Sequence, residues 1–163
     1  MAVAPKRILK VGKSRISIGA MTTDVALAGM KADTTYVPIG GIRNIGNSGM
    51  SYQAINVEEI DDGIVRKGKG VGNPGSLPLT MSRRPTDAGQ LKLIEASRSD
   101  DAFNIRIEEP AGGGKWQVTY ATALVMGREN GRGGPNDTRT LISTLEFTEE
   151  AIEDPTLADT LAA

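Results

Sequence analysis

Apolar and polar residues alternate most clearly in the second half of the chain. Residues 103–107 alternate with period two, and the pattern resumes at residues 116–120 after a turn at residues 110–114. Such alternation is typical of half-buried β-strands, so the two runs predict a hairpin whose second strand continues to residue 126. A polar, glycine-rich loop is expected at residues 127–135, followed by a last strand at 138–147 that turns Leu141, Ser143, Leu145 and Phe147 to one side.

The first half contains further strand signals. Residues 35–39 and 76–82 are expected to be strands, the second with Leu77, Leu79 and Met81 on its buried side. Residues 52–60 alternate loosely and end at the turn-like Asp61-Asp62-Gly63, which favours a hairpin there.

One segment has the pattern of a helix. Asp87 can cap its N-terminus, and Gln90 stands where a capping box needs a side chain that reaches back. The helix is expected to end near Ser97 and to bury Ala88, Leu91 and Ile94, with Leu93 beside them.

The ends of the chain have weaker patterns. Residues 1–34 alternate only loosely and predict an extended N-terminal arm, residues 35–153 a β domain, and residues 154–163 a tail with no role in the core. The basic residues of the first 31 positions and the acidic residues from Glu146 onward leave two interpretations open. They are solvated termini, or head and tail attract one another between copies.

Composition supports a single β-rich domain. The chain has 163 residues, 39% of them hydrophobic and only 4% aromatic, with 20 glycines and 8 prolines. A core of Val, Ile and Leu with many turns follows from these counts. No apolar run is long enough to cross a membrane, and the first residues have no signal-peptide pattern, so we expect a protein that is cytosolic when made.

Most catalytic and cofactor sites are excluded by composition and context. Without cysteine or histidine there is no thiolate nucleophile, no disulfide and no ordinary zinc site. Gly12-Lys13-Ser14 lacks the first glycine of a phosphate-binding loop, since Arg7 occupies that position. The GxGxxG match at residues 70–75 contains Pro74 and precedes a strand. We therefore expect no enzymatic activity and no cofactor.

Two charged groups lie between residues 58 and 69. The acidic group lacks the spacing of a calcium loop, so solvated charge is favoured over a metal site. The basic group has no interleaved aromatic residues, so sequence-specific binding of nucleic acid is not expected. The acidic residues are Glu58, Glu59, Asp61 and Asp62, and the basic residues are Arg66, Lys67 and Lys69.

The order of these elements resembles that of the major tail tube proteins of long-tailed bacteriophages. The resemblance covers roughly residues 35–150. Its segments are Tyr36 to Ile45, Val57 to Asp61, Gly75 to Met81 followed by Asp87, Gln90 and Leu91, then Phe103 to Pro110 and Tyr120 to Gly127.

That resemblance implies an antiparallel β-sandwich or barrel with one flanking helix, a long hairpin or loop excursion, and six copies closing into rings. Stacked rings would form a virion tail tube, assembled in the host cytoplasm, through which double-stranded DNA passes without sequence-specific binding. Other partners would be a tape measure protein and a tail terminator. The excursion between Gly40 and Gly75 is then the expected contact between rings. Its candidate contact residues are Glu58, Glu59, Asp61, Asp62, Arg66, Lys67 and Lys69.

Two other functions remain open from the sequence. A monomeric β-sandwich could bind a glycan or a protein through residues 127–135. A hydrolase that uses paired carboxylates ranks third, because nothing in the sequence indicates which pair would face a cleft.

Overall fold

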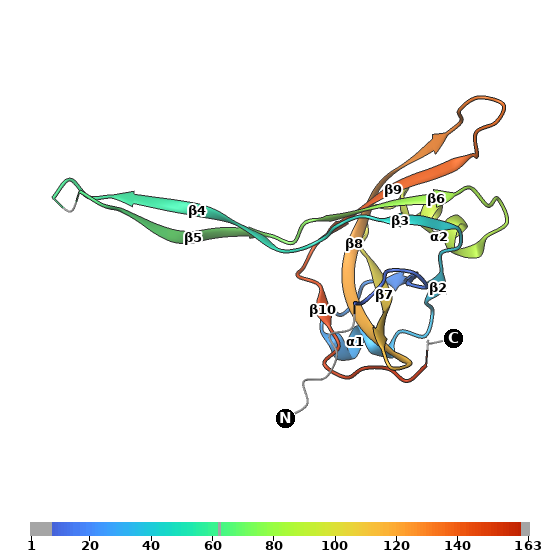
Figure 1. Cartoon of the computed structure of the whole chain (residues 1–163), viewed down its shortest axis with the longest axis horizontal. Helices are drawn as coiled ribbons and strands as arrows, with labels where there is room; N and C mark the ends of the chain where they lie inside the picture. Colours follow the sequence, from blue (N-terminus) through green and yellow to red (C-terminus); the bar gives the residue numbers. More distant parts are fainter. Residues whose placement is uncertain (1–7, 62, 161–163) are drawn as a thin grey trace.

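The computed structural model describes residues 8–61 and 63–160, and these form an antiparallel β-protein from which a long hairpin projects (Figure 1). Its elements in chain order are β1 (Arg15–Met21), α1 (Leu27–Ala32), β2 (Val37–Pro38), β3 (Ile42–Ile45), β4 (Ser51–Glu58), β5 (Val65–Asn73), β6 (Ser76–Ser82), α2 (Ala88–Ala96), β7 (Phe103–Gly112), β8 (Lys115–Gly131), β9 (Thr140–Phe147) and β10 (Ile152–Glu153).

Strand β8 connects the two layers of the body. Its first half pairs with β7 from Lys115 to Ala123, and its second half pairs with β9 from Ala123 to Gly131. The sheet order is β2-β1-β7-β8-β9-β6-β3, with β10 added beside the first half of β8. Because β8 changes partner midway, the β7 side and the β9 side fold over one another and enclose a single core.

The core is built from alternate residues of both layers, as the period-two patterns predict. Strands β6 and β9 bury every second side chain, and β7 buries Ile105 and Ile107 against them. The predicted strands at 76–82, 103–107 and 138–147 are therefore confirmed, the last beginning at Thr140. The β7–β8 hairpin is also confirmed, although its strands pair closer to the turn than expected, with Gly112 opposite Lys115.

Helix α2 begins and ends where the sequence predicts. The Asp87 carboxylate accepts a hydrogen bond from the Gln90 backbone N–H at 2.9 Å, and Ser97 is the C-cap. The predicted buried face is wrong for Ala88 and Leu91, which are exposed, Leu91 to 48%, whereas Ile94 packs against the core and Leu93 and Ala96 belong to it. The helix packs against β1, β2 and β8, and these contacts select a face that its own weak amphipathicity does not define.

The Gln90 side chain is fully buried and does not complete a capping box. Its amide nitrogen donates to the carbonyl oxygens of Gly40 and Ser82, both at 2.8 Å, and its oxygen accepts from the Arg84 backbone N–H at 3.0 Å. One side chain therefore joins the turn at Gly40 to the end of β6 and the segment that follows it.

We predict that Gln90→Leu destabilises the protein by roughly 2 kcal/mol, because the partly buried backbone groups of Gly40, Ser82 and Arg84 lose a partner. Urea denaturation followed by circular dichroism measures this loss. Leu91→Gln on the exposed face is the control and should change the free energy of unfolding by less than about 0.5 kcal/mol. Equal effects of the two substitutions would contradict this account.

Residues 15–36 are part of the packed body, whereas the sequence predicted an extended N-terminal arm over residues 1–34. Strand β1 pairs with β2 and β7, and both Ile16 and Ile18 are fully buried. Behind this layer, Met30 of α1 packs with Tyr36, Val118 and Tyr120 in a second apolar cluster. Both faces of β1 are covered, since Ser17 is buried as well as Ile16 and Ile18. The alternation of β1 is limited to residues 15–18 and is followed by the small residues Gly19 and Ala20, so the sequence pattern did not predict a core strand. Residues 1–7 of the expected arm lie outside the described residues.

Asp33 ties the segment after α1 to β1 and β7. Burial raises the pKa of its carboxyl group, but hydrogen bonds outweigh burial and lower the pKa to about 2. The donors are the Thr35 hydroxyl, the Asn104 side-chain amide, and the backbone N–H groups of Thr35 and Ala20. The ionised carboxylate therefore stabilises the fold.

We predict an acid-sensitive contribution from Asp33. Its folded pKa lies below its ordinary value of 3.8, so the contribution is complete above about pH 4 and is lost as the pH falls towards about 2. Asp33→Asn should lower the free energy of unfolding by about 1 kcal/mol more near neutral pH than at about pH 2. Denaturant melts at a series of pH values test this, and a pH-independent difference would refute it.

The tail expected to have no core role lies along β8. Strand β10 pairs with Thr119 and Tyr120, and Ala158 forms a bridge with Trp116. Asp154 is buried, and Ile152 and Ala158 pack against the second apolar cluster. Residues 152–158 are therefore part of the packed body.

Among the described residues, no helix is long and apolar enough to cross a membrane.

Candidate assembly surfaces

The most prominent surface of the protein is the hairpin of β4 and β5, residues 51–73, which we call the arm. It extends away from the body, and its strands pair only with each other (Figure 1). Every residue of β4 is exposed. The hairpin predicted around residues 61–63 is confirmed, with β4 ending at Glu58 and β5 beginning at Val65.

Only part of the excursion expected between Gly40 and Gly75 projects from the body. Strand β3 pairs with β6 and belongs to the body, whereas the arm does not. At the base of the arm, Gly75 has a φ of +85°, and a Cβ there would lie 2.6 Å from the Gly49 carbonyl oxygen. Only glycine fits this close crossing of the two chain segments.

The described candidate contact residues all lie on the arm. Glu58 ends β4, Glu59 and Asp61 follow in the turn, and the three cations lie in β5. Asp62 lies outside the described residues. Within the described ranges, no group of three or more acidic side chains is placed to hold a metal ion.

The two faces of the arm differ in chemistry. One face carries Ile55 and Val57, which are 51% and 45% exposed, opposite Gly68 and Arg66 on β5. We call this the apolar face of the arm. The other face carries Tyr52, whose ring lies 3.4 Å from the Lys69 ammonium in a cation–π contact. Ala54, Asn56 and Lys67 share that polar face.

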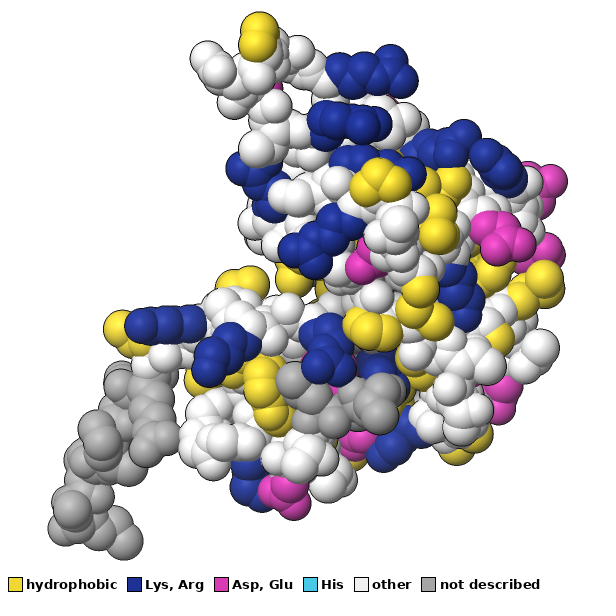
Figure 2. All heavy atoms as spheres, turned by 90° about the vertical axis from the view of Figure 1, so that its right-hand side faces the viewer, with side chains coloured by type: hydrophobic (Ala, Val, Ile, Leu, Met, Phe, Trp, Pro, Cys, Tyr) yellow, Lys and Arg dark blue, Asp and Glu magenta, His cyan; other side chains and the backbone are white. Residues whose placement is uncertain are grey.

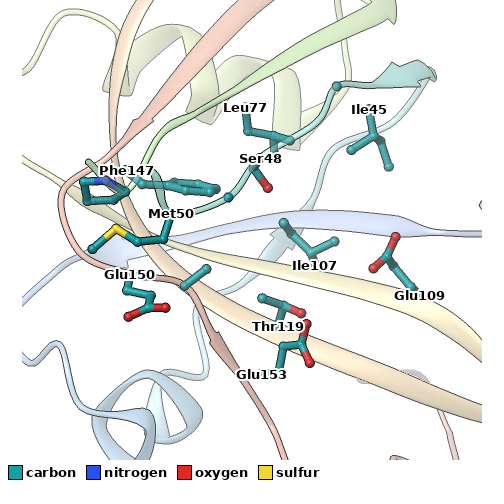
Figure 3. A pocket seen from close by; sticks show the side chains of 14 residues that line it. Ile45, Ser48, Met50, Leu77, Ile107, Glu109, Thr119, Phe147, Glu150 and Glu153 are labelled. Carbon is teal, nitrogen blue, oxygen red and sulfur yellow. The ribbon is translucent and has the colours of Figure 1, made fainter. Parts of the chain in front are cut away.

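A cleft of about 350 Å³ opens between the layers at the base of the arm (Figure 3). Its floor is apolar, and three carboxylates stand around it, from Glu109, Glu150 and Glu153. No Lys or Arg lines it. The apolar lining residues include Ile45, Met50, Leu77, Ile107, Phe147 and Ala151.

A second projection is the β8–β9 hairpin. Residues 127–131, expected as loop, belong to β8, and the connection to β9 spans residues 132–139. Arg128, Arg132 and Arg139 are exposed there, and Figure 2 shows Lys and Arg side chains gathered over this upper part of the molecule. The Arg43 guanidinium donates to the Thr138 hydroxyl at 2.8 Å, which fastens the connection to β3.

The outward face of β6 and β9 carries mainly hydroxyl groups and almost no charge. Its outward positions alternate with the buried core positions of both strands. Glu146 is the one charged residue among them. These residues are Ser76, Pro78, Thr80, Ser82, Thr140, Ile142, Thr144 and Glu146.

Part of the basic head and acidic tail meet within one chain. The Lys31 ammonium lies 2.6 Å from the Asp154 carboxylate. This hydrogen bond raises the pKa of Lys31 and lowers the pKa of Asp154. This pair is neither a set of solvated termini nor a contact between copies, because both partners belong to one chain.

The two glycine motifs lie in ordinary backbone elements. Residues 12–13 form a turn, and residues 70–73 belong to β5.

No family model matches the chain, and no curated protein matches it. Solved structures, however, match the chain in fold. A PVC sheath/tube terminator of an extracellular contractile injection system aligns with a TM-score of 0.68 and 14% identity, over 93% of this chain and 99% of that one. The fold is shared with components of tube and sheath assemblies. The tube-terminating cap of the anti-feeding prophage gives a TM-score of 0.69 at 12% identity, covering 94% of this chain and 95% of that one.

The SPP1 tail tube has the same fold, with a TM-score of 0.62 and 13% identity over 90% of this chain and 78% of that chain. The predicted fold class and the resemblance to tail tube proteins are confirmed at the level of fold. These structures are a tail tube, a sheath/tube terminator and a tube-terminating cap. The acidic cleft was missed by the sequence analysis, because its glutamates lie in separate segments without a shared motif.

Proposed function

We propose that this chain is a structural subunit that assembles with its own copies into stacked hexameric rings, forming a tail tube that conducts DNA. The observation that carries the proposal is the tail tube fold together with an arm that has no partner in the body. A single two-stranded hairpin is marginally stable in water, so a long exposed arm is best explained by a partner that covers it. Contacts between unlike surfaces of identical copies propagate into rings and filaments.

The nearly uncharged outward face of β6 and β9 supports the same function. A conduit for DNA works best when its wall does not hold phosphates, since phosphate contacts dominate the affinity of proteins for DNA. The outward hydroxyls of Thr80 and Thr144, with Glu146 nearby, fit a wall of this kind. We assign this face to the channel, with duplex DNA passing along it.

The proposed setting is a virion tail assembled in the host cytoplasm, with a tape measure protein and a tail terminator as further partners. The comparison structures include a sheath/tube terminator and a tube-terminating cap, which supports partners of this type. The contact between rings would lie on the arm, through Glu58, Glu59, Asp61, Asp62, Arg66, Lys67 and Lys69.

We predict that a shortened arm separates folding from assembly. Replacing residues 55–68 with an Asn-Gly turn should leave a soluble, folded monomer, because loop length alters closure entropy by only about 0.6 kcal/mol per doubling. Tubes should be absent by light scattering and electron microscopy, while the full chain forms them. Unfolding of the variant would place the arm in the core, and normal tubes would place the contact elsewhere.

We also predict that Thr80 and Thr144 face the channel axis in the assembled tube. A cryo-EM reconstruction tests their position directly. Thr144→Lys tubes should retain short duplex DNA at low ionic strength, because each ring gains a circle of cations, whereas Thr144→Glu tubes should not. A ring of Lys67 and Lys69 around the axis would refute this assignment of the channel wall.

A further inference from the structure

The apolar face of the arm is unusually flat. Gly68 stands opposite Ile55, and a Cβ at Gly70 would lie 3.1 Å from the Ile55 side chain, so both glycines leave this face uncovered. Ile55 and Val57 are thus half-exposed on a two-stranded sheet that nothing in the described chain supports. Removing them from water would stabilise any complex in which another surface covers them.

The cleft offers a surface of matching chemistry. Its floor is apolar, and its charged lining groups are three carboxylates. Strand β5 carries Arg66, Lys67 and Lys69, and residues 64–75 contain no acidic residue. The apolar face of the arm therefore suits the floor of the cleft, and Arg66, the cation on that face, suits the carboxylates of its rim.

The arm cannot fill the cleft of its own chain. Val57 lies six residues beyond Ser51, which is about 20 Å along an extended strand. Figure 1 shows the arm directed away from the body, while the cleft lies at the base of the arm. The occupant must come from another molecule.

We propose that the apolar face of the arm, with Ile55 and Val57 at its centre, docks into the acidic cleft of a second copy of this chain. Arg66, which lies opposite Val57 on the same face, then lies beside Glu109, Glu150 and Glu153 of that copy, while Lys67 and Lys69 on the polar face point away from the cleft. This inference rests on the proposed self-assembly and adds to it the two surfaces that meet. The contact joins unlike surfaces, so a docked pair still presents one free arm and one free cleft, and the assembly can grow.

Cysteine cross-linking tests the contact directly, because the natural chain has no cysteine. Ser48 is exposed and lines the cleft (Figure 3), so the variant Val57→Cys/Ser48→Cys places one thiol on each proposed surface. With a short bismaleimide under assembly conditions, we expect a ladder of covalent multimers on a denaturing gel. Each single-cysteine variant should remain monomeric.

The matched control is Ala54→Cys/Ser48→Cys, which moves the arm thiol to the polar face and should give several times less ladder. Assembly of the cysteine-free chain is measured in parallel by light scattering. If that chain assembles but the Val57 ladder is absent or no stronger than the control, the docking surfaces are wrong. Dimers of the Val57→Cys variant alone would show arm-to-arm pairing instead. If the cysteine-free chain does not assemble at all, the proposed function itself fails.

A steric variant tests the flatness of the face. A Cβ added at Gly68 would lie 3.8 Å or more from the nearest atoms, which belong to Ile55, so the isolated arm has room for Gly68→Val. Valine also has a higher strand propensity than glycine. It should nevertheless raise the concentration needed for assembly by about tenfold or more, a change of about 1.4 kcal/mol, because the added side chain keeps the surfaces apart. Ala54→Val on the polar face should change it little. Equal effects of the two substitutions would overturn the proposal.

Discussion

The continuous pairing of β8 with both β7 and β9 is the interaction on which the rest of the structure depends. A strand of 17 residues forms one layer with its first half and the other layer with its second. Because the backbone hydrogen bonds continue through the bend, the two layers cannot move apart without breaking the ladder. This places the apolar faces of β6 and β9 against those of β1 and β7 and fixes the position of the cleft between them.

The body and the arm are stabilised in different ways. In the body, buried alternate side chains supply the stability, and buried polar groups such as Gln90 and Asp33 satisfy backbone atoms that the ladders leave unpaired. The arm has only its own ladder and exposed side chains. This division suits the proposed assembly, because the exposed side chains of the arm remain available to a partner surface.

Charge is distributed to match this division. Cations lie along β5 and the β8–β9 connection, while carboxylates surround the cleft. The formal net charge of −1 therefore conceals surfaces of opposite sign on one molecule. Such surfaces attract the unlike surface of a neighbouring copy and repel the like one, which favours head-to-tail contacts over symmetric pairs.

Local periodicity and turn chemistry were enough to predict the β-rich class, the strands at 76–82 and 103–107, the cap at Asp87 and the hairpin that forms the arm. Contacts between distant segments were needed to show that β1 is a core strand, that Gln90 and not Leu91 faces inward, and that the tail lies along β8. Those outcomes depend on what covers each residue from a distant part of the chain. The cleft belongs to the same group, since its walls come from segments that meet only when β8 joins the layers.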